Sequence, residues 1–293
     1  MNRLEDRVAV ITGASRGIGK AIAIACAAEG ARVAVVARTE AQWDARMPGS
    51  IHETVGDIRA AGGTATAIAA DLANPDEVDT VIERARSALG PIGILVNNAA
   101  LTIPGRPPKA PRVEASHESS AQRSAPTQSG PLRNSFLSFP LKGFRLHLEI
   151  GLFAAYRLMQ CALPDMIEVG QGGIVNISSL AGFIPGEGPY QRPGTPGPIA
   201  YGGNKAALHH LTQSVAIEMQ EYGIAVNALS PSEPVFTPGN LVAAAGETDW
   251  ASPEEFAEAT LRVAIADPHV TTGQLLWSDD VLHPERGRRG WLR

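Results

Sequence analysis

The stretch AYGGNKAAL, residues 200–208, places a tyrosine and a lysine four positions apart. Apolar residues recur at helical spacing after Lys205, so Tyr201 and Lys205 are predicted to lie one above the other on one face of a helix. A phenol has a pKa of about 10, which a neighbouring ammonium group lowers by stabilising the phenolate. Such a pair is suited to exchanging a proton with a substrate oxygen.

A second stretch whose residues could form a binding site is TGASRGIG, residues 12–19, which lies between an expected strand and an expected helix. Glycines at such a turn let backbone N–H groups approach a pyrophosphate, and the helix presents its positive end to the same anion. We therefore expect a dinucleotide to bind here. The residues expected to contact it are Gly13, Ser15, Arg16, Gly17, Ile18 and Gly19.

The elements that must position these groups alternate between strand and helix. Short apolar runs predict strands at 7–15, 31–38, 64–71, 93–97, 172–178, 223–230 and near 273–277. Helical periodicity and capping residues predict helices at about 17–29, 50–62, 75–89, 151–166, 201–222 and from about 252. This alternation predicts an α/β fold with a doubly wound parallel sheet (Rossmann fold), as a single domain over residues 1–293.

Two stretches interrupt the alternation. Residues 106–135 contain five prolines and six serines without apolar periodicity, and residues 185–198 are rich in proline and glycine. Both are expected to be flexible insertions.

Composition narrows the class of protein. The net charge of −5 and the absence of a basic cluster argue against nucleic acid as a partner. The two cysteines lie in apolar surroundings, and His209 and His210 lack a carboxylate or thiol at ligand spacing, so no metal is expected. With no signal-peptide core and no long apolar run, we expect a soluble, cytoplasmic protein that does not enter a membrane.

Five motifs in order resemble those of the short-chain dehydrogenase/reductase family: TGASRGIG, AADL at 69–72, NNAA at 97–100, ISSLAG at 177–182, and Tyr201 with Lys205. The resemblance implies an oxidoreductase that transfers a hydride between NADP(H) and a carbonyl or secondary alcohol, with a small ketone or alcohol as substrate. It implies that Ser179 orients the substrate oxygen and that Tyr201 exchanges the proton. Lys205 would lower the tyrosine pKa and hold the nicotinamide ribose. Homodimers or homotetramers are expected by the same likeness.

Further cofactor contacts follow from the same resemblance. Asp71 and Leu72 match positions that hold the adenine, and Asn98 lies where the fourth strand meets the cofactor. Val235 and Thr237 fall in a loop, PSEPVFT, that resembles the one closing on the nicotinamide.

Cofactor preference is predicted from the end of the second strand. An acidic residue there would bind the ribose hydroxyls and repel a 2′-phosphate, but this chain has Arg38. Arg16 resembles a second cation near that phosphate. NADP(H) is therefore favoured over NAD(H).

The chain departs from the family pattern at several positions. Gly151 stands where an asparagine normally kinks a helix and holds a water linking the lysine to solvent, which threatens proton supply. Ser232 replaces a glycine of the loop that closes on the nicotinamide. Ser179 and Tyr201 are 22 residues apart, longer than is usual, so the segment between them must bulge outward. Small residues at Gly202 and Gly203 suggest a helix face packed against cofactor, or simply a loosened helix start.

Two alternatives remain open. A nucleotide-binding module that has lost turnover would keep the glycine turn and act as a sensor or in an assembly. A sugar-nucleotide epimerase would share the Tyr-Lys pair but would require a larger substrate domain after Lys205.

Overall fold

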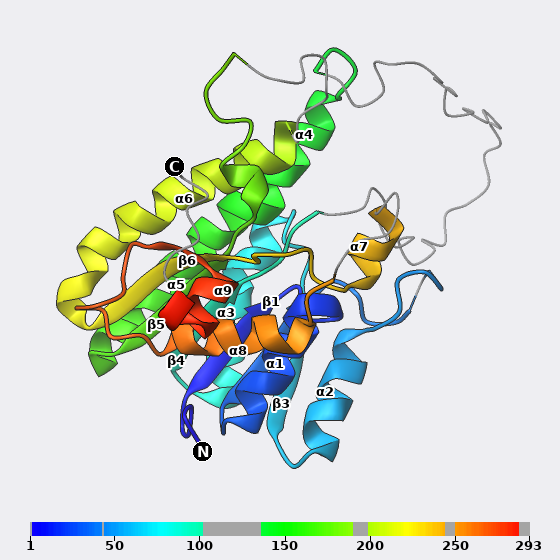
Figure 1. Ribbon diagram of the computed structural model, residues 1–293. Helices are drawn as coiled ribbons and strands as arrows, with labels where there is room; N and C mark the ends of the chain where they lie inside the picture. The colour runs from blue at the N-terminus through cyan, green and yellow to red at the C-terminus, as the bar shows by residue number, and fades with distance from the viewer. Residues whose placement is uncertain (1, 43, 102–135, 190–198, 244–249, 287–293) are drawn as a thin grey trace, which may run out of the picture.

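The computed structural model describes residues 2–42, 44–101, 136–189, 199–243 and 250–286 (Figure 1). Its described residues form a parallel sheet of seven strands in the order β3-β2-β1-β4-β5-β6-β7. The strands are β1 (Val8–Thr12), β2 (Arg32–Ala37), β3 (Thr64–Ala69), β4 (Ile92–Asn97), β5 (Gly172–Ile177), β6 (Ile224–Ser230) and β7 (Leu275–Trp277). From β1 the chain passes through β2 to β3 at one edge of the sheet. It then returns to β4, on the other side of β1, and continues to β7 at the opposite edge. The predicted doubly wound Rossmann-type sheet is confirmed.

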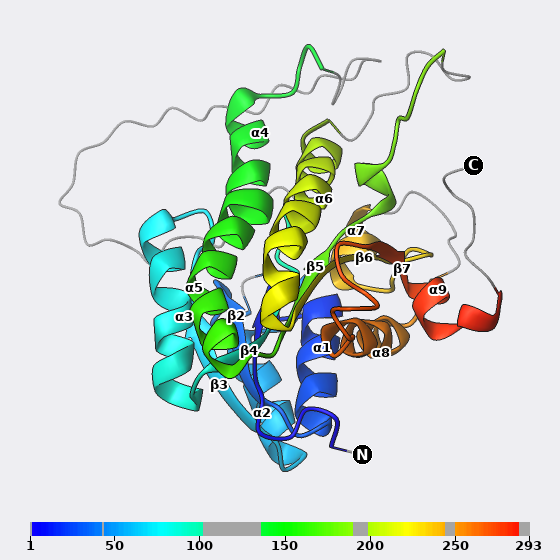
Figure 2. The same ribbon diagram turned by 90° about the vertical axis from the view of Figure 1, so that its left-hand side faces the viewer.

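Helices cover both faces of this sheet (Figures 1 and 2). One face is covered by α1 (Gly17–Ala28), α2 (Ile51–Ala60) and α8 (Pro253–Ala264). The other is covered by α3 (Pro75–Leu89), α5 (Ala154–Val169) and α6 (Ile199–Met219). The shorter helices are α4 (Leu141–Leu148), α7 (Pro238–Ala243) and α9 (Ser278–Leu282). In the described part of the chain, no helix is long and apolar enough to cross a membrane.

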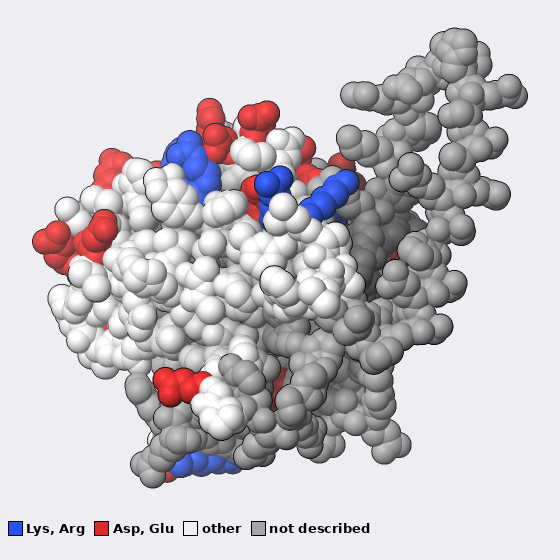
Figure 3. Space-filling view, turned by 90° about the horizontal axis from the view of Figure 1, so that it is seen from above, with Lys and Arg blue, Asp and Glu red and all other residues white. Residues whose placement is uncertain are grey.

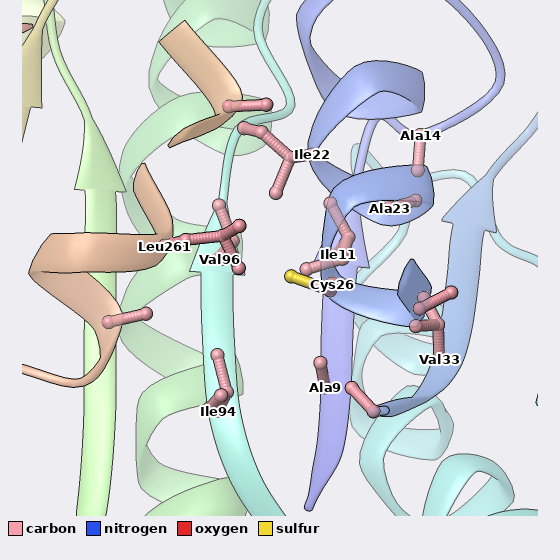
Figure 4. Packing of buried hydrophobic residues seen from close by; sticks show 14 of the residues in the cluster. Ala9, Ile11, Ala14, Ile22, Ala23, Cys26, Val33, Ile94, Val96 and Leu261 are labelled. Atoms are coloured by element: carbon pink, nitrogen blue, oxygen red, sulfur yellow. The ribbon is translucent and has the colours of Figure 1, made fainter. Parts of the chain in front are cut away.

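Two apolar cores lie between the sheet and its helices, because successive side chains of a strand point to opposite faces. In β1, Ala9 and Ile11 join the core beneath α1, α2 and α8, whereas Val8 and Val10 join the opposite core. Figure 4 shows Ile22 and Cys26 of α1 pointing toward the strands of the first core. Cys26 is a buried residue of this core, and its burial raises the pKa of the thiol to about 12.

Capping residues set several helix starts at the predicted positions. The Ser50 side chain accepts a hydrogen bond of 3.1 Å from the Glu53 backbone N–H at the start of α2. Asn74 does the same for Asp76 at 3.3 Å in α3, where Pro75 is the first helical residue.

The helix expected at 151–166 begins earlier than predicted. Leu141–Leu148 form α4, and a π-helical segment, η1 (Glu149–Phe153), joins it to α5. The prediction missed α4, none of whose residues is buried. The short α7 and α9 were also not predicted. The first insertion expected from the sequence, residues 106–135, lies outside the described residues. Of the second, residues 185–198, only 185–189 are described, and they form neither helix nor strand.

Candidate active site

The glycine-rich turn joins the carboxyl end of β1 to the start of α1. A Cβ built at Gly19 would overlap the Gly13 carbonyl oxygen and lie 2.5 Å from the Asn98 Nδ2 atom, so only glycine permits this close approach. Arg16 is the extended residue that precedes α1, and Ser15 beside it is buried. The backbone N–H groups of the first turn of α1 and the positive end of this helix therefore point to the same side of the glycine turn, where an anion would bind.

Asn98 connects this turn to the end of β4. Its Nδ2 donates a 2.8 Å hydrogen bond to the Thr12 carbonyl oxygen, and its backbone N–H donates to Thr12 Oγ1 at 3.0 Å. These bonds cross from β4 to β1, the strand from which the chain winds in both directions. Ligands of open α/β sheets bind at such a point, beyond the carboxyl ends of the strands.

Arg16 and Arg38 lie at the same corner of the site. Arg16 Nε donates to the Pro48 carbonyl oxygen at 3.1 Å, and its Nη2 donates to that of Gly49 at 2.9 Å, which fixes the guanidinium against the loop before α2. Burial lowers the pKa of Arg16, and the positive charge of Arg38 lowers it further. Two cations close enough to interact make a local positive field that suits a phosphate.

Asp71 and Leu72 follow β3. Asp71 accepts a 3.1 Å hydrogen bond from the Ala73 N–H through its carboxylate, and its own N–H donates to Glu77 at 2.7 Å. Leu72 is buried in the core beneath α3. Both contacts hold the turn at the carboxyl end of β3, where the adenine is expected.

The loop after β6 reaches the glycine turn and is fastened near both of its ends. Ser232 Oγ accepts a 2.9 Å hydrogen bond from the Asp279 N–H, and the Ser232 N–H donates to Ser278 Oγ at 3.0 Å. Thr237 accepts from the Asn240 N–H at 3.0 Å, and a Cβ built at Gly17 would lie 3.1 Å from Thr237 Cγ2. The serine at 232 thus gives this loop a defined path by tying it to the start of α9.

Val235 lies between these two anchors. It is buried and pairs with Ala251 in an isolated parallel bridge. The side chain of Asn240 donates to its carbonyl oxygen at 2.8 Å.

Ser179, Tyr201 and Lys205 come together beyond the end of β5. Lys205 is 2% exposed, its Nζ donates a 2.6 Å hydrogen bond to the Ile177 carbonyl oxygen, and it lies 5.6 Å from the centre of the Tyr201 ring. The Ser179 hydroxyl lies close enough to the Tyr201 side chain to lower its pKa by hydrogen bonding. The second irregular stretch therefore does not keep the serine and tyrosine apart.

The two serines of ISSLAG have different partners. Ser178 is buried and hydrogen-bonds the His209 Nε2 atom, whereas Ser179 faces Tyr201 and also accepts a 3.2 Å hydrogen bond from the Ala181 N–H. Of the two serines, Ser179 is therefore the one that lies beside Tyr201.

Burial dominates the electrostatics of the pair. It raises the pKa of Tyr201, and the hydrogen bond from Ser179 only partly opposes that rise. The net direction is therefore the opposite of the one expected, because burial outweighs any lowering of the tyrosine pKa by Lys205. The reason is that the phenol itself is desolvated, while the Lys205 Nζ is directed to the Ile177 carbonyl. Burial also lowers the pKa of Lys205, to about 8.

Sequence analysis missed His147 of α4. Its ring centre lies 6.3 Å from that of Tyr201 in an edge-on arrangement, and burial, followed by the charge of Lys205, lowers its pKa. The only signals available were Pro140, which precedes α4, and the spacing of Phe144 and Leu148.

Close packing of this helix face against the cofactor was one reason expected for the two glycines between Tyr201 and Lys205. It can apply to Gly202 but not to Gly203. Gly202 is buried, but Gly203 is exposed and a Cβ built there would meet nothing within 4 Å among the described atoms.

The described surface seen from above, on the side of the strand carboxyl ends, is largely uncharged, with charged side chains near its margin (Figure 3).

Comparisons with known proteins agree with this architecture. A family model described as short chain dehydrogenase matches residues 7–123 and 130–240. An uncharacterised oxidoreductase of Mycobacterium tuberculosis is 34% identical over 248 residues, covering 84% of this chain and 76% of that protein. A 3-oxoacyl-[acyl-carrier-protein] reductase of Synechocystis is 31% identical over 233 residues, covering 79% of this chain and 75% of its own length.

Solved structures give the same result. A 3-oxoacyl (acyl-carrier-protein) reductase from Agrobacterium tumefaciens with NADP bound is 27% identical, with a TM-score of 0.70, over 94% of this chain and 93% of that one. The chain is therefore a member of the short-chain dehydrogenase/reductase family, an NAD(P)-dependent oxidoreductase that acts on CH–OH and C=O groups.

Proposed function

We propose that this protein interconverts a small carbonyl compound and the corresponding secondary alcohol, with NADP(H) preferred over NAD(H), and that Ser179, Tyr201 and Lys205 carry the reaction. The observation that supports this most directly is the meeting of a hydroxyl, a phenol and a buried ammonium at the carboxyl end of β5. A module that had lost turnover would have no need to keep a lysine 2% exposed.

The residues present fit a dinucleotide. The close turn at Gly19, the start of α1 and the loop at Thr237 face one space, and the two arginines mark one end of it. The groups proposed to hold the cofactor are Gly13, Ser15, Arg16, Gly17, Ile18, Gly19, Arg38, Asp71, Leu72, Asn98, Tyr201, Lys205, Val235 and Thr237. The chemistry that a bound nicotinamide supplies is hydride transfer to or from the substrate carbon.

The side chains of the site supply the proton and the orientation. In reduction, the Ser179 hydroxyl donates a hydrogen bond to the substrate oxygen, and Tyr201 gives its proton to that oxygen as the carbon is reduced. The phenolate that remains is stabilised by the Lys205 ammonium. In oxidation the same proton moves from the alcohol to the phenolate. Because burial raises the pKa of Tyr201, the phenol keeps its proton at neutral pH, which favours its use as the donor in reduction.

Preference for NADP(H) rests on Arg16 and Arg38. Charge-assisted hydrogen bonds contribute about 1.5–3 kcal/mol each, so Arg38→Ala should raise the KM for NADPH by roughly tenfold or more while changing the KM for NADH little. Arg157→Ala, on the exposed surface of α5, is the matched control. Equal effects on both cofactors would contradict the assignment of Arg38 to the 2′-phosphate.

The experiment that tests the activity follows the absorbance of reduced nicotinamide in purified protein mixed with NADPH and a panel of ketones. Tyr201→Phe should reduce kcat by about 10²–10⁴-fold, the usual contribution of a general acid. The exposed Tyr222→Phe should leave it unchanged. If NADPH binds but no ketone is reduced by the unaltered protein, the non-catalytic module is the better description.

A further inference from the structure

The helix that runs through α4, η1 and α5 packs against α6, and it lies very close to Asn204 of α6 at Gly151. A Cβ built at Gly151 would overlap the Asn204 Nδ2 atom and would lie 2.9 Å from the Asn204 Cγ and 3.0 Å from its Oδ1. The side-chain amide of Asn204 therefore occupies the space that a side chain at residue 151 would require. A larger residue at 151 would require the buried Asn204 side chain to move.

Asn204 is placed among the residues of the proposed reaction. It directly precedes Lys205 and follows Tyr201 by three positions, so all three lie near one another on the first turns of α6. It is 1% exposed. The helix opposite it is π-helical over Glu149–Phe153, with the Ala154 N–H donating to the Glu149 carbonyl oxygen, and such widened turns are frequent at functional sites.

Two buried polar atoms on these facing helices have no hydrogen-bond partner among the described residues: Asn204 Oδ1 and His147 Nδ1. His147 lies one helical turn before Gly151, and its ring packs edge-on against Tyr201. Buried polar atoms without a partner are rare and costly, so each requires an explanation. An amide oxygen and the unprotonated nitrogen of a neutral imidazole are both acceptors, and one water molecule has two O–H donors to satisfy them.

We propose that Asn204 is a positioning residue that supplies, from α6, the amide that the family resemblance places at residue 151, and that Asn204 and His147 together hold the water through which Tyr201 regains its proton. The proposal rests on the proposed function. In each reduction Tyr201 loses one proton to the substrate oxygen, and one proton from solvent restores it, so the relay gains no net charge. The imidazole accepts a proton at one nitrogen as it releases one from the other.

The overlap between a side chain at residue 151 and Asn204 provides the test. Four proteins are compared: the unaltered chain, Asn204→Ala, Gly151→Asn, and the double variant Gly151→Asn/Asn204→Ala, which moves the amide from one helix to the other. Asn204→Ala should lower kcat about tenfold, the effect of losing one hydrogen bond of ordinary strength, and should increase the solvent deuterium isotope effect on kcat. The KM for NADPH and the thermal midpoint should change little.

Gly151→Asn alone should lower the thermal midpoint by several degrees, because its side chain would displace the buried Asn204 amide. In the double variant the midpoint and most of the lost kcat should return. The matched control is Gly203→Asn, which adds the same side chain to an exposed position of α6. An unchanged kcat and isotope effect in Asn204→Ala would overturn the relay, and failure of the double variant to recover its thermal midpoint would overturn the exchange of positions.

A readout that does not depend on turnover is the nitrogen spectrum of His147 in labelled protein. Asn204→Ala should shift the His147 Nδ1 resonance, because the water that bridges the two side chains is lost. An unchanged resonance would also contradict the proposal. If the unaltered protein turns over ketones and Tyr201→Phe abolishes the activity while Asn204→Ala has no effect, the relay fails and the proposed function stands. If no substrate reacts, the proposed function fails, and the midpoints still report whether residues 151 and 204 share one space.

Discussion

Replacing Lys205 by methionine should make the stability of the protein depend on pH in a way that can be worked out from burial. The lysine ammonium is desolvated, which lowers its pKa from 10.5 to about 8 in the folded state. At about 1.4 kcal/mol per pKa unit, the folded protein at pH 7 is less stable by about 3 kcal/mol than it would be without this shift. Lys205→Met keeps the length of the side chain and removes its charge, so the variant should gain this stability of about 3 kcal/mol at pH 7. Loss of the hydrogen bond to the Ile177 carbonyl should reduce the gain by about 1 kcal/mol.

The sign of the pH effect follows from proton binding. Between pH 8 and 10.5 the unfolded chain keeps the lysine proton longer than the folded chain does, so the stability of the unaltered protein rises with pH in this window. From pH 7 to 9.5 this term amounts to about 2 kcal/mol. The stability advantage of Lys205→Met should therefore shrink by about 2 kcal/mol over that range.

The assay is urea unfolding of both proteins at several values between pH 7 and 9.5, followed by circular dichroism. Cys26 and Tyr201 have pKa values raised by burial and weaken the fold at high pH, but both proteins contain them, so the difference isolates Lys205. His147 and His209, which also sense the lysine charge, have lowered pKa values and are neutral throughout. Lys142→Met on the exposed surface of α4 is the control. A difference that stays constant with pH would refute the argument that this ammonium is desolvated.

Four further predictions concern single positions. Gly19→Ala should raise the Kd for NADPH at least tenfold in a fluorescence titration, because the new Cβ would overlap the Gly13 carbonyl oxygen. Arg16→Ala should raise the KM for NADPH more than that for NADH in steady-state assays, since one of the two cations proposed to bind the 2′-phosphate is lost. Gly203→Ala should raise the free energy of unfolding by about 0.5–1 kcal/mol in urea titrations, because the site is open and helical. Asp165→Ala should lower it by about 2 kcal/mol in the same measurement, since the Ile92 N–H would lose its 2.8 Å acceptor.

Much of the fold followed from the sequence because the strands are short, apolar and bounded by glycine or capping residues. Ser50, Asn74 and Pro75 marked helix starts through local backbone bonding, which a sequence pattern records directly. The helix α4 was missed although its apolar residues recur at helical spacing, and its residues are half-buried or exposed in the fold.

The sequence predicted that Tyr201 and Lys205 lie close together, but not the direction in which the pKa of Tyr201 is shifted. Spacing alone placed Tyr201 and Lys205 on one helix face, and the structure keeps the ammonium 5.6 Å from the ring centre. The direction of the tyrosine pKa shift depends on how much water burial removes from both groups, which no spacing reports. His147 and the overlap of Asn204 with residue 151 depend on how two helices from distant parts of the chain pack together.

The anchoring of the loop after β6 has a consequence for cofactor affinity. Ser232 fastens one end of this loop to α9, Val235 is paired with Ala251, and Thr237 is held by Asn240 against the glycine turn. A segment already confined in this way loses little conformational freedom when a ligand arrives, so less of the contact energy is consumed in ordering it. Returning the family's glycine at position 232 would restore that freedom and weaken binding, even though residue 232 need never touch the dinucleotide.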